Sequence, residues 1–377
     1  MKMNRLPVLC PLIFMLMLTA FLPAWASQSG ALILPDHPDI QYTGRIGFTD
    51  SLAPVIYWPG TYIKACFEGT SCRVILEDST GNNFYNVIID HDENNLLILY
   101  CRQGTHTYPV AVGLKDTVHH IQIFRRTEGF SGPTRFRGLI LDAGKLLAAP
   151  PERPPHKIEF YGNSITCGMG NEVPANEEDE HNSKRNNYLA YGAITARNLN
   201  ADYTCIAKSG IGIVISWFDM VMSDYYYRLN PWDPDSRWDF SQWIPDVVVI
   251  NLFQNDSWLI EKLEPVPTDS QIVGAYKDFL QTIRGHYPEA YIICTLGSMD
   301  AVKDSSAWPG YITNAVEQFS KENQDVKTDT LFFPFDGTYK HPRVCHHEEM
   351  AKKLTAFIRE KLNWQNPCQH TLQTHRQ

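Results

Sequence analysis

The chain has 377 residues, with 33 Lys and Arg against 42 Asp and Glu, which gives a formal net charge of −9. Hydrophobic residues make up 44% and charged residues 20%, so a disordered, collagen-like or coiled-coil protein is excluded. The acidic balance, with no basic run, argues against nucleic acid as the partner. At roughly 150 residues per domain, the length predicts two domains or one large one.

Residues 1–26 have the parts of a signal peptide. Lys2 and Arg5 form a positive start, an apolar run follows over 12–22, and Ala24-Trp25-Ala26 is a small-x-small cleavage site. The apolar run is shorter than the roughly 20 residues that a membrane span needs. We therefore expect a secreted or periplasmic protein that is not bound to a membrane after cleavage. The alternative is an uncleaved anchor.

Export would place the protein in an oxidising compartment, where disulfides can persist. Of the nine cysteines, only Cys10 lies in the expected signal peptide. Cys66 and Cys72 flank a Gly-Thr-Ser turn, which makes them candidates for a bridge. The other spacings are irregular and no C-x-x-C pair is present, so a metal cluster is not expected.

Residues 27–149 are predicted to form a β-sandwich of the jelly-roll type. Short runs rich in β-branched and aromatic residues are separated by turn clusters, with no long helical period. The predicted strands are 62–67, 72–76, 85–90, 95–101, 120–125 and 136–141. The Pro-rich stretch 150–155 is a stiff, extended linker that marks the end of this domain.

Residues 156–366 are predicted to form a three-layer α/β domain with a parallel sheet, followed by a polar tail over 367–377. Strand and helix patterns alternate along this part of the chain. The predicted strands are 156–161, 203–207, 246–252, 290–296 and 330–334, and the helical stripes are 188–198, 272–283, 311–323 and 350–362. In such sheets ligands bind at the carboxyl ends of the strands.

A serine stands where the first of these strands ends. An apolar strand runs into Gly162-Asn163-Ser164 and then into a Gly-rich turn. A serine at a strand-to-helix junction has its hydroxyl at the rim and its own N–H facing the same space, as a nucleophile requires. The alternative is a helix N-cap. No G-x-S-x-G elbow is present, which argues against a lipase-type α/β-hydrolase.

Two further strand exits carry candidate oxyanion donors. Residues 207–212 follow the second strand and end in Gly212, where a backbone N–H can approach a ligand closely. Asn255 follows the buried strand 246–252, and its side-chain amide can donate to an oxyanion. The alternatives are an ordinary turn at the first exit and an asparagine that caps local backbone at the second.

A histidine precedes the last predicted helix. His341 stands directly before a proline, which favours an extended loop, and it is a candidate general base. An alternative is a metal site made of His341, Cys345, His346 and His347. We disfavour it because the ligand pattern of known zinc motifs is absent.

These four motifs, in this order, resemble the SGNH (GDSL-type) hydrolase superfamily. The resemblance implies a serine esterase in which Ser164 is the nucleophile, Gly212 and Asn255 complete the oxyanion hole, and His341 is the base, with no metal or organic cofactor. The β-domain narrows the resemblance to carbohydrate esterase family two. The segments that carry it are 59–63, 67–71, 125–128, 136–138, 163–168 and 341–342.

That family resemblance implies a substrate class. We expect removal of O-acetyl groups from plant cell-wall polysaccharides or oligosaccharides, with primary acetyl groups on gluco- or manno-configured sugars favoured. The aromatic-rich insertion before Asn255, and Trp258 after it, should border the site, and Trp217, Trp232 and Trp258 are the candidate sugar contacts. The alternative is that the aromatic rings of the insertion fill a small core of their own.

The chain departs from the superfamily pattern at three positions. Asn163 stands where Asp is usual, and Phe253 replaces a glycine and should crowd the loop at the acyl pocket. The superfamily Asp lies three residues before the His, where this chain has Thr338. Asp336 is the nearest carboxylate before it, so either Asp336 or a backbone carbonyl is expected to orient His341.

Two other functions remain open at this point. A lipid or small acyl-ester esterase on the same scaffold would have a long apolar acyl groove. A non-catalytic glycan-binding protein would have a blocked or misoriented Ser164.

Overall fold

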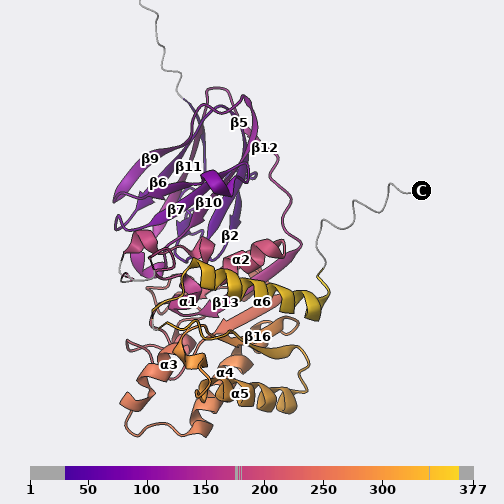
Figure 1. The fold of residues 1–377 in the computed structure, drawn as a ribbon. Helices are drawn as coiled ribbons and strands as arrows, with labels where there is room; N and C mark the ends of the chain where they lie inside the picture. Colours follow the sequence, from indigo (N-terminus) through magenta and orange to yellow (C-terminus); the bar gives the residue numbers. More distant parts are fainter. Residues whose placement is uncertain (1–29, 175–176, 178, 180, 339, 365–377) are drawn as a thin grey trace, which may run out of the picture.

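The computed structural model describes residues 30–174, 177, 179, 181–338 and 340–364. Two antiparallel sheets lie at one end of the molecule, and a parallel sheet flanked by helices lies at the other (Figure 1). The expected signal peptide, 1–26, and the expected polar tail, 367–377, lie outside the described residues.

The predicted β-sandwich is confirmed. The first sheet comprises β1 (Ala31–Ile33), β3 (Ile46–Gly47), β4 (Val55–Ile56), β6 (Cys72–Asp78), β9 (Gly104–Ala111) and β11 (Thr134–Leu141). The second comprises β2 (Gln41–Thr43), β5 (Tyr62–Gly69), β7 (Phe84–Ile89), β8 (Leu97–Tyr100), β10 (Thr117–Arg125) and β12 (Leu147–Ala148). Alternate side chains of both sheets, among them Phe67, Val74 and Phe136, are fully buried in the core between them.

The sequence patterns missed the edge of this sandwich. Among the described strands, β9 pairs only with β6. It carries Pro109, and its first six residues alternate partly exposed with exposed side chains, so it lacks the apolar signal of a central strand. A bridge between Cys66 and Cys72 is wrong, because both are free thiols. Cys72 points into the core from one sheet, whereas Cys66 alternates with the inward-facing residues of the other.

The predicted parallel α/β unit is also confirmed. Its strand order is β14–β13–β15–β16–β17, and every neighbouring pair is parallel. The strands are β13 (His156–Gly162), β14 (Ala201–Ala207), β15 (Val247–Asn251), β16 (Tyr291–Leu296) and β17 (Thr328–Phe332). Strand β15 is buried along its whole length, as its unbroken apolar sequence predicts for the centre of a covered sheet.

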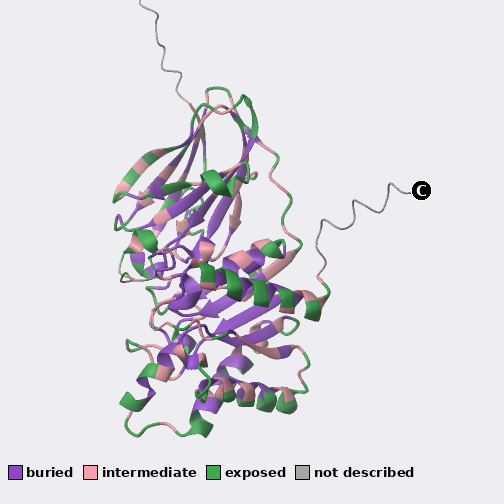
Figure 2. Cartoon of the chain, viewed as in Figure 1, coloured by how far each residue is buried: buried purple, intermediate pink, exposed green. Residues whose placement is uncertain are grey.

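Helices cover both faces of the parallel sheet. They are α1 (Ser164–Cys167), α2 (Tyr191–Asn198), α3 (Gln254–Leu259), α4 (Asp269–His286), α5 (Trp308–Asn323) and α6 (Val344–Leu362). The apolar sides of α4 and α5 pack into one core, and those of α2 and α6 into the other. Figure 2 shows the exposed residues on the outward sides of α5 and α6. Among the described residues, no helix has the length and apolarity needed to cross a membrane.

The sandwich and the α/β unit are joined by buried polar contacts. The Trp58 indole donates to the carbonyl of Leu229 at 2.7 Å, and the Tyr62 hydroxyl donates to Asp202 at 2.6 Å. Arg45 of the sandwich is 1% exposed and lies 3.5 Å from the buried carboxylate of Glu159. Because a buried charge is costly unless it is paired, these contacts fix how the two parts meet.

Candidate active site

Three parallel strands end in one row. Gly162 at the end of β13 pairs in register with Ala207 at the end of β14 and with Asn251 at the end of β15. The chain that leaves each strand therefore emerges at the same edge of the sheet. These three exits carry the first three motifs singled out in the sequence, which places them together.

Ser164 is the first residue of α1. Gly162 permits the sharp strand-to-helix turn, since a Cβ there would lie 2.0 Å from Thr166 Oγ1. Asn163 is the N-cap, and its Oδ1 accepts the N–H of Ile165 at 3.0 Å, so asparagine performs the capping that aspartate could also perform. The sequence placed the Ser164 hydroxyl out at the rim, but Ser164 is only 6% exposed.

Gly212 lies where no side chain fits. A Cβ at this position would lie 2.0 Å from the carbonyl oxygen of Ile215 and 2.6 Å from Asp256 Oδ2. Its N–H donates to Ser216 Oγ at 2.9 Å. The N–H that the sequence predicted as an oxyanion donor is thus hydrogen-bonded to Ser216 in this structure.

The Asn255 side chain is held in one orientation. Its Nδ2 donates to the carbonyl of Ile211 at 2.8 Å, and its Oδ1 accepts the indole N–H of Trp217 at 3.2 Å. Asn255 is 3% exposed. Because one amide hydrogen is used by Ile211, the other remains to serve as a donor at the strand edge.

Asp256 fixes the loop that follows Gly212. Its Oδ1 accepts the N–H groups of Ile213, Val214 and Ile215 at 3.0, 2.6 and 3.1 Å. Burial raises the pKa of this carboxyl to about 6, although the three N–H groups oppose the shift. No motif in the sequence predicts this role for Asp256, which ties the second strand exit to the third.

The Phe253 ring packs into the core of the α/β unit. The backbone of Phe253 is left-handed, with φ 84°, a conformation that explains why glycine is usual here. The ring is fully buried in the core and packs on Tyr276 and Trp308, with centroids 4.9 and 5.0 Å apart. The contacts of the buried Phe253 ring with Tyr276 and Trp308 thus stabilise a residue whose left-handed backbone is unfavourable for phenylalanine.

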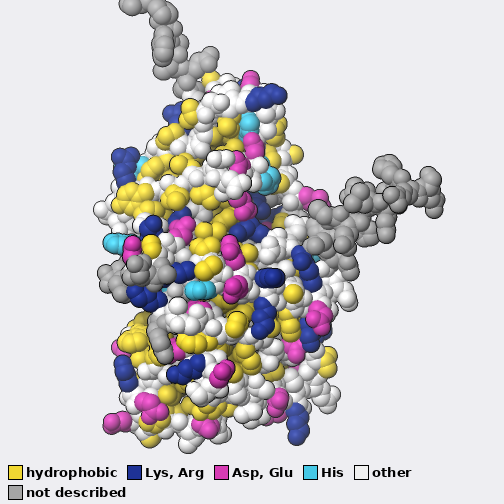
Figure 3. Space-filling view, in the orientation of Figure 1, with side chains coloured by type: hydrophobic (Ala, Val, Ile, Leu, Met, Phe, Trp, Pro, Cys, Tyr) yellow, Lys and Arg dark blue, Asp and Glu magenta, His cyan; other side chains and the backbone are white. Residues whose placement is uncertain are grey.

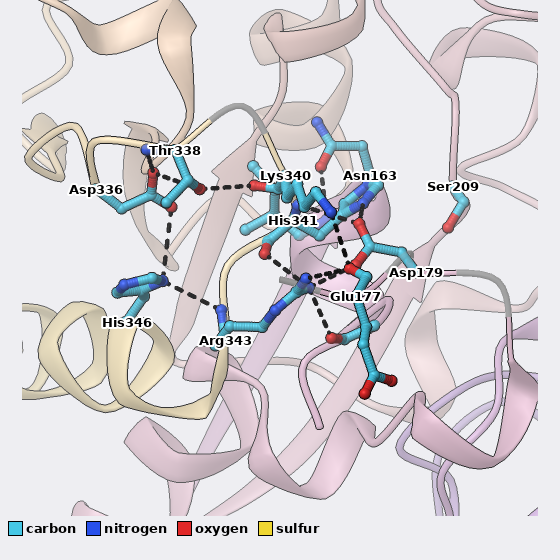
Figure 4. Close-up of polar contacts among 12 residues, drawn as sticks. Asn163, Glu177, Asp179, Ser209, Asp336, Thr338, Lys340, His341, Arg343 and His346 are labelled. Atoms are coloured by element: carbon cyan, nitrogen blue, oxygen red, sulfur yellow. Dashed lines mark hydrogen bonds and ion pairs between the residues drawn. The ribbon is translucent and has the colours of Figure 1, made fainter. Parts of the chain in front are cut away.

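His341 is held by a carboxylate from a distant part of the sequence. Asp179 Oδ2 lies 2.8 Å from His341 Nδ1 and accepts the His341 backbone N–H at 3.2 Å (Figure 4). Asp179 precedes α2 and is separated from His341 by 162 positions. With Nδ1 engaged, Nε2 is the ring nitrogen that remains for proton transfer.

Arg343 completes this cluster. Its Nη1 lies 2.5 Å from Asp179 Oδ1 and donates to the carbonyl oxygens of Gly170 at 2.9 Å and His341 at 3.1 Å. Burial raises the pKa of the Asp179 carboxyl, but the hydrogen bonds from His341 and Arg343 outweigh burial and lower it to about 2. Asp179 is therefore ionised at neutral pH, as an orienting carboxylate must be.

The His341 loop is docked on the turn that follows Ser164. Besides the Arg343 contact with Gly170, the N–H of Val344 donates to the carbonyl of Asn171 at 3.0 Å. Hydrogen bonds thus connect the loop bearing the candidate base with the segment leaving the candidate nucleophile.

Asp336 does not contact His341. Its carboxylate accepts the N–H of Thr338 at 2.9 Å and the hydroxyl of Ser298 at 3.2 Å, and it lies 3.7 Å from His346 Nδ1. Figure 4 shows Asp336 and Asp179 on opposite sides of Arg343. Neither partner considered from the sequence, Asp336 or a backbone carbonyl, is the one found at His341 Nδ1.

Little in the sequence identified Asp179. It lies in a run of acidic residues, Glu177-Glu178-Asp179-Glu180, which is typical of a solvated loop. No strand end or spacing rule connects that run with His341.

The aromatic residues of the insertion divide between surface and core. Trp217 and Trp232 are 57% and 58% exposed, and Trp258 is 37% exposed. In contrast, Tyr225 is buried and packs edge-on against Trp58 with centroids 5.0 Å apart. Trp217 contacts Asn255 and so borders the candidate site directly. The Trp232 indole donates to the carbonyl of Gly129 in the sandwich, at 2.9 Å, and Trp258 donates to Asp300.

The alternative metal ligands point to different partners. His341 pairs with Asp179, and His346 Nδ1 accepts the backbone N–H of Arg343 at 3.1 Å. His347 is buried, and its Nδ1 accepts the N–H of Tyr191 at 3.2 Å, while Cys345 is exposed. Within the described ranges, no three His, Cys, Asp or Glu residues are grouped as metal ligands.

The fold and the sequence of this chain are similar to those of known carbohydrate esterases. Residues 42–151 match the family described as "Carbohydrate esterase 2 N-terminal". A Cellvibrio japonicus protein named acetylxylan esterase / glucomannan deacetylase is 33% identical over 325 residues, which cover 82% of this chain and 87% of that protein. The chain therefore belongs to carbohydrate esterase family two.

Two further relatives extend the comparison. The Acetivibrio thermocellus protein named cellulase/esterase CelE is 36% identical over 339 residues, which cover 87% of this chain but 40% of CelE. The chain thus spans less than half the length of that relative. A structure of a family two carbohydrate esterase from Clostridium thermocellum in complex with cellohexaose is 35% identical with a TM-score of 0.79, and the match covers 86% of this chain and 100% of that one.

Proposed function

We propose that this chain is a serine esterase that removes O-acetyl groups from plant cell-wall polysaccharides or their oligosaccharides. The hydrogen-bond contact of Asp179 with His341 Nδ1, 2.8 Å long and docked beside the turn after Ser164, is the observation that carries the proposal. The names of the Cellvibrio and Acetivibrio relatives and the cellohexaose bound to the Clostridium esterase support a carbohydrate substrate.

The first half of the reaction transfers the acetyl group to the enzyme. His341 Nε2 takes the proton of Ser164 Oγ as that oxygen forms a bond to the acetyl carbonyl carbon. Ionised Asp179 stabilises the imidazolium and keeps the ring oriented. As the tetrahedral intermediate collapses, the bond to the sugar oxygen breaks, and His341 gives its proton to that oxygen.

The second half releases acetate. Water gives a proton to His341 and attacks the acetyl-Ser164 carbonyl, and collapse of the second intermediate returns the proton to Ser164 Oγ. In both intermediates the negative oxygen is stabilised by the second amide hydrogen of Asn255 and by the N–H groups of Ser164 and Gly212. The Gly212 contribution requires rotation of the Ser216 hydroxyl, which accepts that N–H in the unliganded protein.

The exposed tryptophans provide faces on which sugar rings can stack. Trp217 lies next to Asn255 and is the first candidate for a sugar contact. Trp232 lies further along the insertion, and Trp258 lies in α3. On the face drawn in Figure 3, acidic and basic side chains are interspersed, with no concentration of Lys and Arg. Together with the formal net charge of −9, this favours a neutral polysaccharide over a polyanion as the substrate.

Acetate release tests the proposal. Purified protein and the Ser164→Ala variant are each incubated with acetylated xylan, acetylated glucomannan and acetylated cello-oligosaccharides, and free acetate is measured. The wild-type chain is expected to release acetate from at least one of them and the variant from none. Preferential hydrolysis of long-chain acyl esters, or binding of glycans without acetate release, would contradict the proposal and favour a lipid esterase or a glycan-binding protein.

We also propose that residues 1–26 direct export and are then removed. The positive start, the apolar run and the Ala24-Trp25-Ala26 site support this. Expression of the full chain followed by N-terminal sequencing of the exported protein should give Ser27 as the first residue. Retention of Met1 on a membrane-bound protein would indicate an uncleaved anchor.

A further inference from the structure

A carboxylate of the β-sandwich reaches the second strand exit. Glu128 lies between β10 and the short helix η2 (Gly129–Ser131) and is 1% exposed. Its Oε2 accepts the backbone N–H of Ser209 at 2.8 Å, and its Oε1 accepts the Ser209 hydroxyl at 2.7 Å. Ser209 belongs to the loop that leaves β14 and leads to Gly212, so Glu128 fixes the start of that loop from the other domain.

The same carboxylate touches the helix of the nucleophile. Cys167 ends α1, which begins at Ser164, and its thiol lies 3.6 Å from Glu128 Oε2. Burial, with the charge of Glu128 adding to it, raises the pKa of the Cys167 thiol, so the thiol stays protonated and can donate. Arg185 neutralises the carboxylate, with Nη1 at 3.1 Å from Oε1. Glu128 is thus a buried charge whose partners all lie in the α/β unit.

Hydrogen bonds continue from Ser209 to the Asn255 amide. The N–H of Ile211 donates to the carbonyl of Lys208 at 3.2 Å, which closes a tight turn around Ser209. The carbonyl of Ile211 in turn accepts Asn255 Nδ2 at 2.8 Å. A displacement of Ser209 therefore moves the acceptor that orients the amide.

The residue two before Glu128 holds the segment that bears Asp179. Arg126 is buried, forms an ion pair with Glu172, and donates through Nη2 to the carbonyl of Ser183 at 2.9 Å. Its own carbonyl accepts the N–H of Asn187 at 3.0 Å. A single turn of the sandwich thus contacts segments on both sides of Asp179 as well as the loop at Ser209.

We propose that Glu128 is a positioning residue of the esterase, through which the β-sandwich sets the geometry of the oxyanion donors. The proposal rests on the proposed function. It predicts that the sandwich is needed for turnover as well as for folding, because an oxyanion donor displaced by a fraction of an ångström loses much of its effect on the transition state.

The matched pair Glu128→Gln and Glu77→Gln tests this. Glu77 is a partly exposed glutamate of the same sandwich, paired only with Arg135 and Arg137 of its own domain among the described contacts. In Glu128→Gln an amide NH₂ replaces one acceptor oxygen and faces donors. We expect kcat for 4-nitrophenyl acetate to fall about tenfold to a hundredfold with KM changed less than about twofold. Glu77→Gln should retain wild-type kcat.

A double-mutant cycle separates positioning from general destabilisation. If Glu128 acts through the Asn255 amide, Glu128→Gln should reduce kcat much less in an Asn255→Ala background than in the wild type. Equal losses in both backgrounds, or wild-type kcat in folded Glu128→Gln, would overturn the proposal. Melting temperature and circular dichroism are recorded for each variant, so that a loss of folded protein is not counted as a loss of kcat.

Ser209→Ala is the second variant, used if Glu128→Gln does not fold. It removes one of the two hydrogen bonds and keeps the backbone contact, and we expect a several-fold loss of kcat that also disappears in the Asn255→Ala background. An additive loss there would overturn the proposal. The two proposals fail differently: a wild-type chain that releases no acetate contradicts the proposed function, whereas an active wild type with a fully active Glu128→Gln contradicts only the positioning role.

Discussion

Two loops at the carboxyl edge of the parallel sheet each carry an aspartate, and their roles are the reverse of what sequence distance suggests. Asp336 lies five positions before His341 but accepts from Ser298 and Thr338. Asp179 lies 162 positions away and accepts from His341. The difference shows that the loop's own hydrogen bonds, rather than proximity along the chain, decide which carboxylate reaches the imidazole.

Local geometry explains both outcomes. The Asp336 side chain is used to close its own turn at Thr338, and its backbone N–H donates to the carbonyl of Ser298 at 2.8 Å, so it is anchored facing away. Asp179 packs against Gly170, where a Cβ would lie 2.8 Å from Asp179 atoms. The absence of a side chain at Gly170 thus leaves room for Asp179, and the guanidinium of Arg343 provides the positive charge that pairs with its carboxylate.

The largest effect on turnover is expected for substitution of the candidate nucleophile, Ser164. Ser164→Ala should abolish turnover of a small acetyl ester, because the Ser164 hydroxyl is the nucleophile that receives the acetyl group in the proposed mechanism. Ser164 is the first residue of α1, and alanine has a higher helix propensity than serine, so thermal stability should change little. Activity is measured with 4-nitrophenyl acetate beside a melting curve. If more than a few per cent of activity persisted in a stable variant, the nucleophile would be another residue.

Asp179→Ala tests one side of the comparison directly. Loss of an orienting carboxylate lowers kcat by as much as ~10⁴ in Ser-His-Asp proteases, and we expect a loss of at least about a hundredfold with little change in KM. Asp179→Asn serves as the isosteric variant, since it keeps the size of the side chain and removes the charge. Near wild-type kcat in both variants would show that the Asp179–His341 contact has no part in turnover.

Asn255→Ala sharpens the comparison by disturbing the site without touching either aspartate. Loss of one oxyanion donor lowers kcat by roughly 10²–10³, and KM should change little because the donor meets a charge that exists only in the transition state. Steady-state kinetics on the acetyl ester separate the two constants. A change confined to KM would indicate that Asn255 binds the sugar instead.

Asp256 is a third aspartate at the carboxyl edge of the parallel sheet, and Asp256→Asn should change how the free energy of unfolding depends on pH. Its folded-state pKa of about 6 lies above the ordinary 3.8, so the folded protein binds this proton more tightly than the unfolded chain does. Its contribution to the free energy of unfolding is therefore greatest below about pH 4 and decreases as pH rises through about 6. Asparagine is neutral at every pH and can retain the oxygen that accepts three N–H groups, so the variant should show a flatter dependence.

Chemical denaturation of both proteins at pH 4, 5, 6 and 7 measures this difference. The wild-type protein should lose more unfolding free energy than Asp256→Asn between pH 4 and 6. Equal slopes would mean that Asp256 titrates in the folded protein as it does in the unfolded chain.

The sequence predicted the regular parts of the molecule well. The apolar run over 247–250 identified a strand covered on both faces, and the spacing of Ile272, Tyr276, Phe279 and Ile283 identified the buried side of α4. These patterns work because burial repeats with the period of the element. Strand β9 was missed because an edge strand with a solvated face has no such repeat.

Sequence reasoning identified the parts of the site that lie at strand ends and missed those that depend on tertiary contact. Ser164 and Asn255 could be predicted because each follows an apolar strand within a few residues. Asp179 and Glu128 reach the site from a loop and from another domain, respectively, and their side chains look like ordinary surface acids in the sequence. Only the folded chain shows that one is paired with His341 and the other is fully buried.

Asp336→Ala should have a much smaller effect on kcat than Asp179→Ala, which completes the comparison of the two aspartates. The carboxylate has no contact with His341 among the described residues, but it closes the turn at Thr338 and lies 3.7 Å from His346. Its loss should loosen the loop that leads to His341 while Asp179 still holds the imidazole. We therefore expect less than a tenfold loss of kcat, in contrast with the large loss for Asp179→Ala. A thousandfold loss, with His341 still bound to Asp179 in a crystal structure of the variant, would show that Asp336 assists turnover by a route other than orientation of the base.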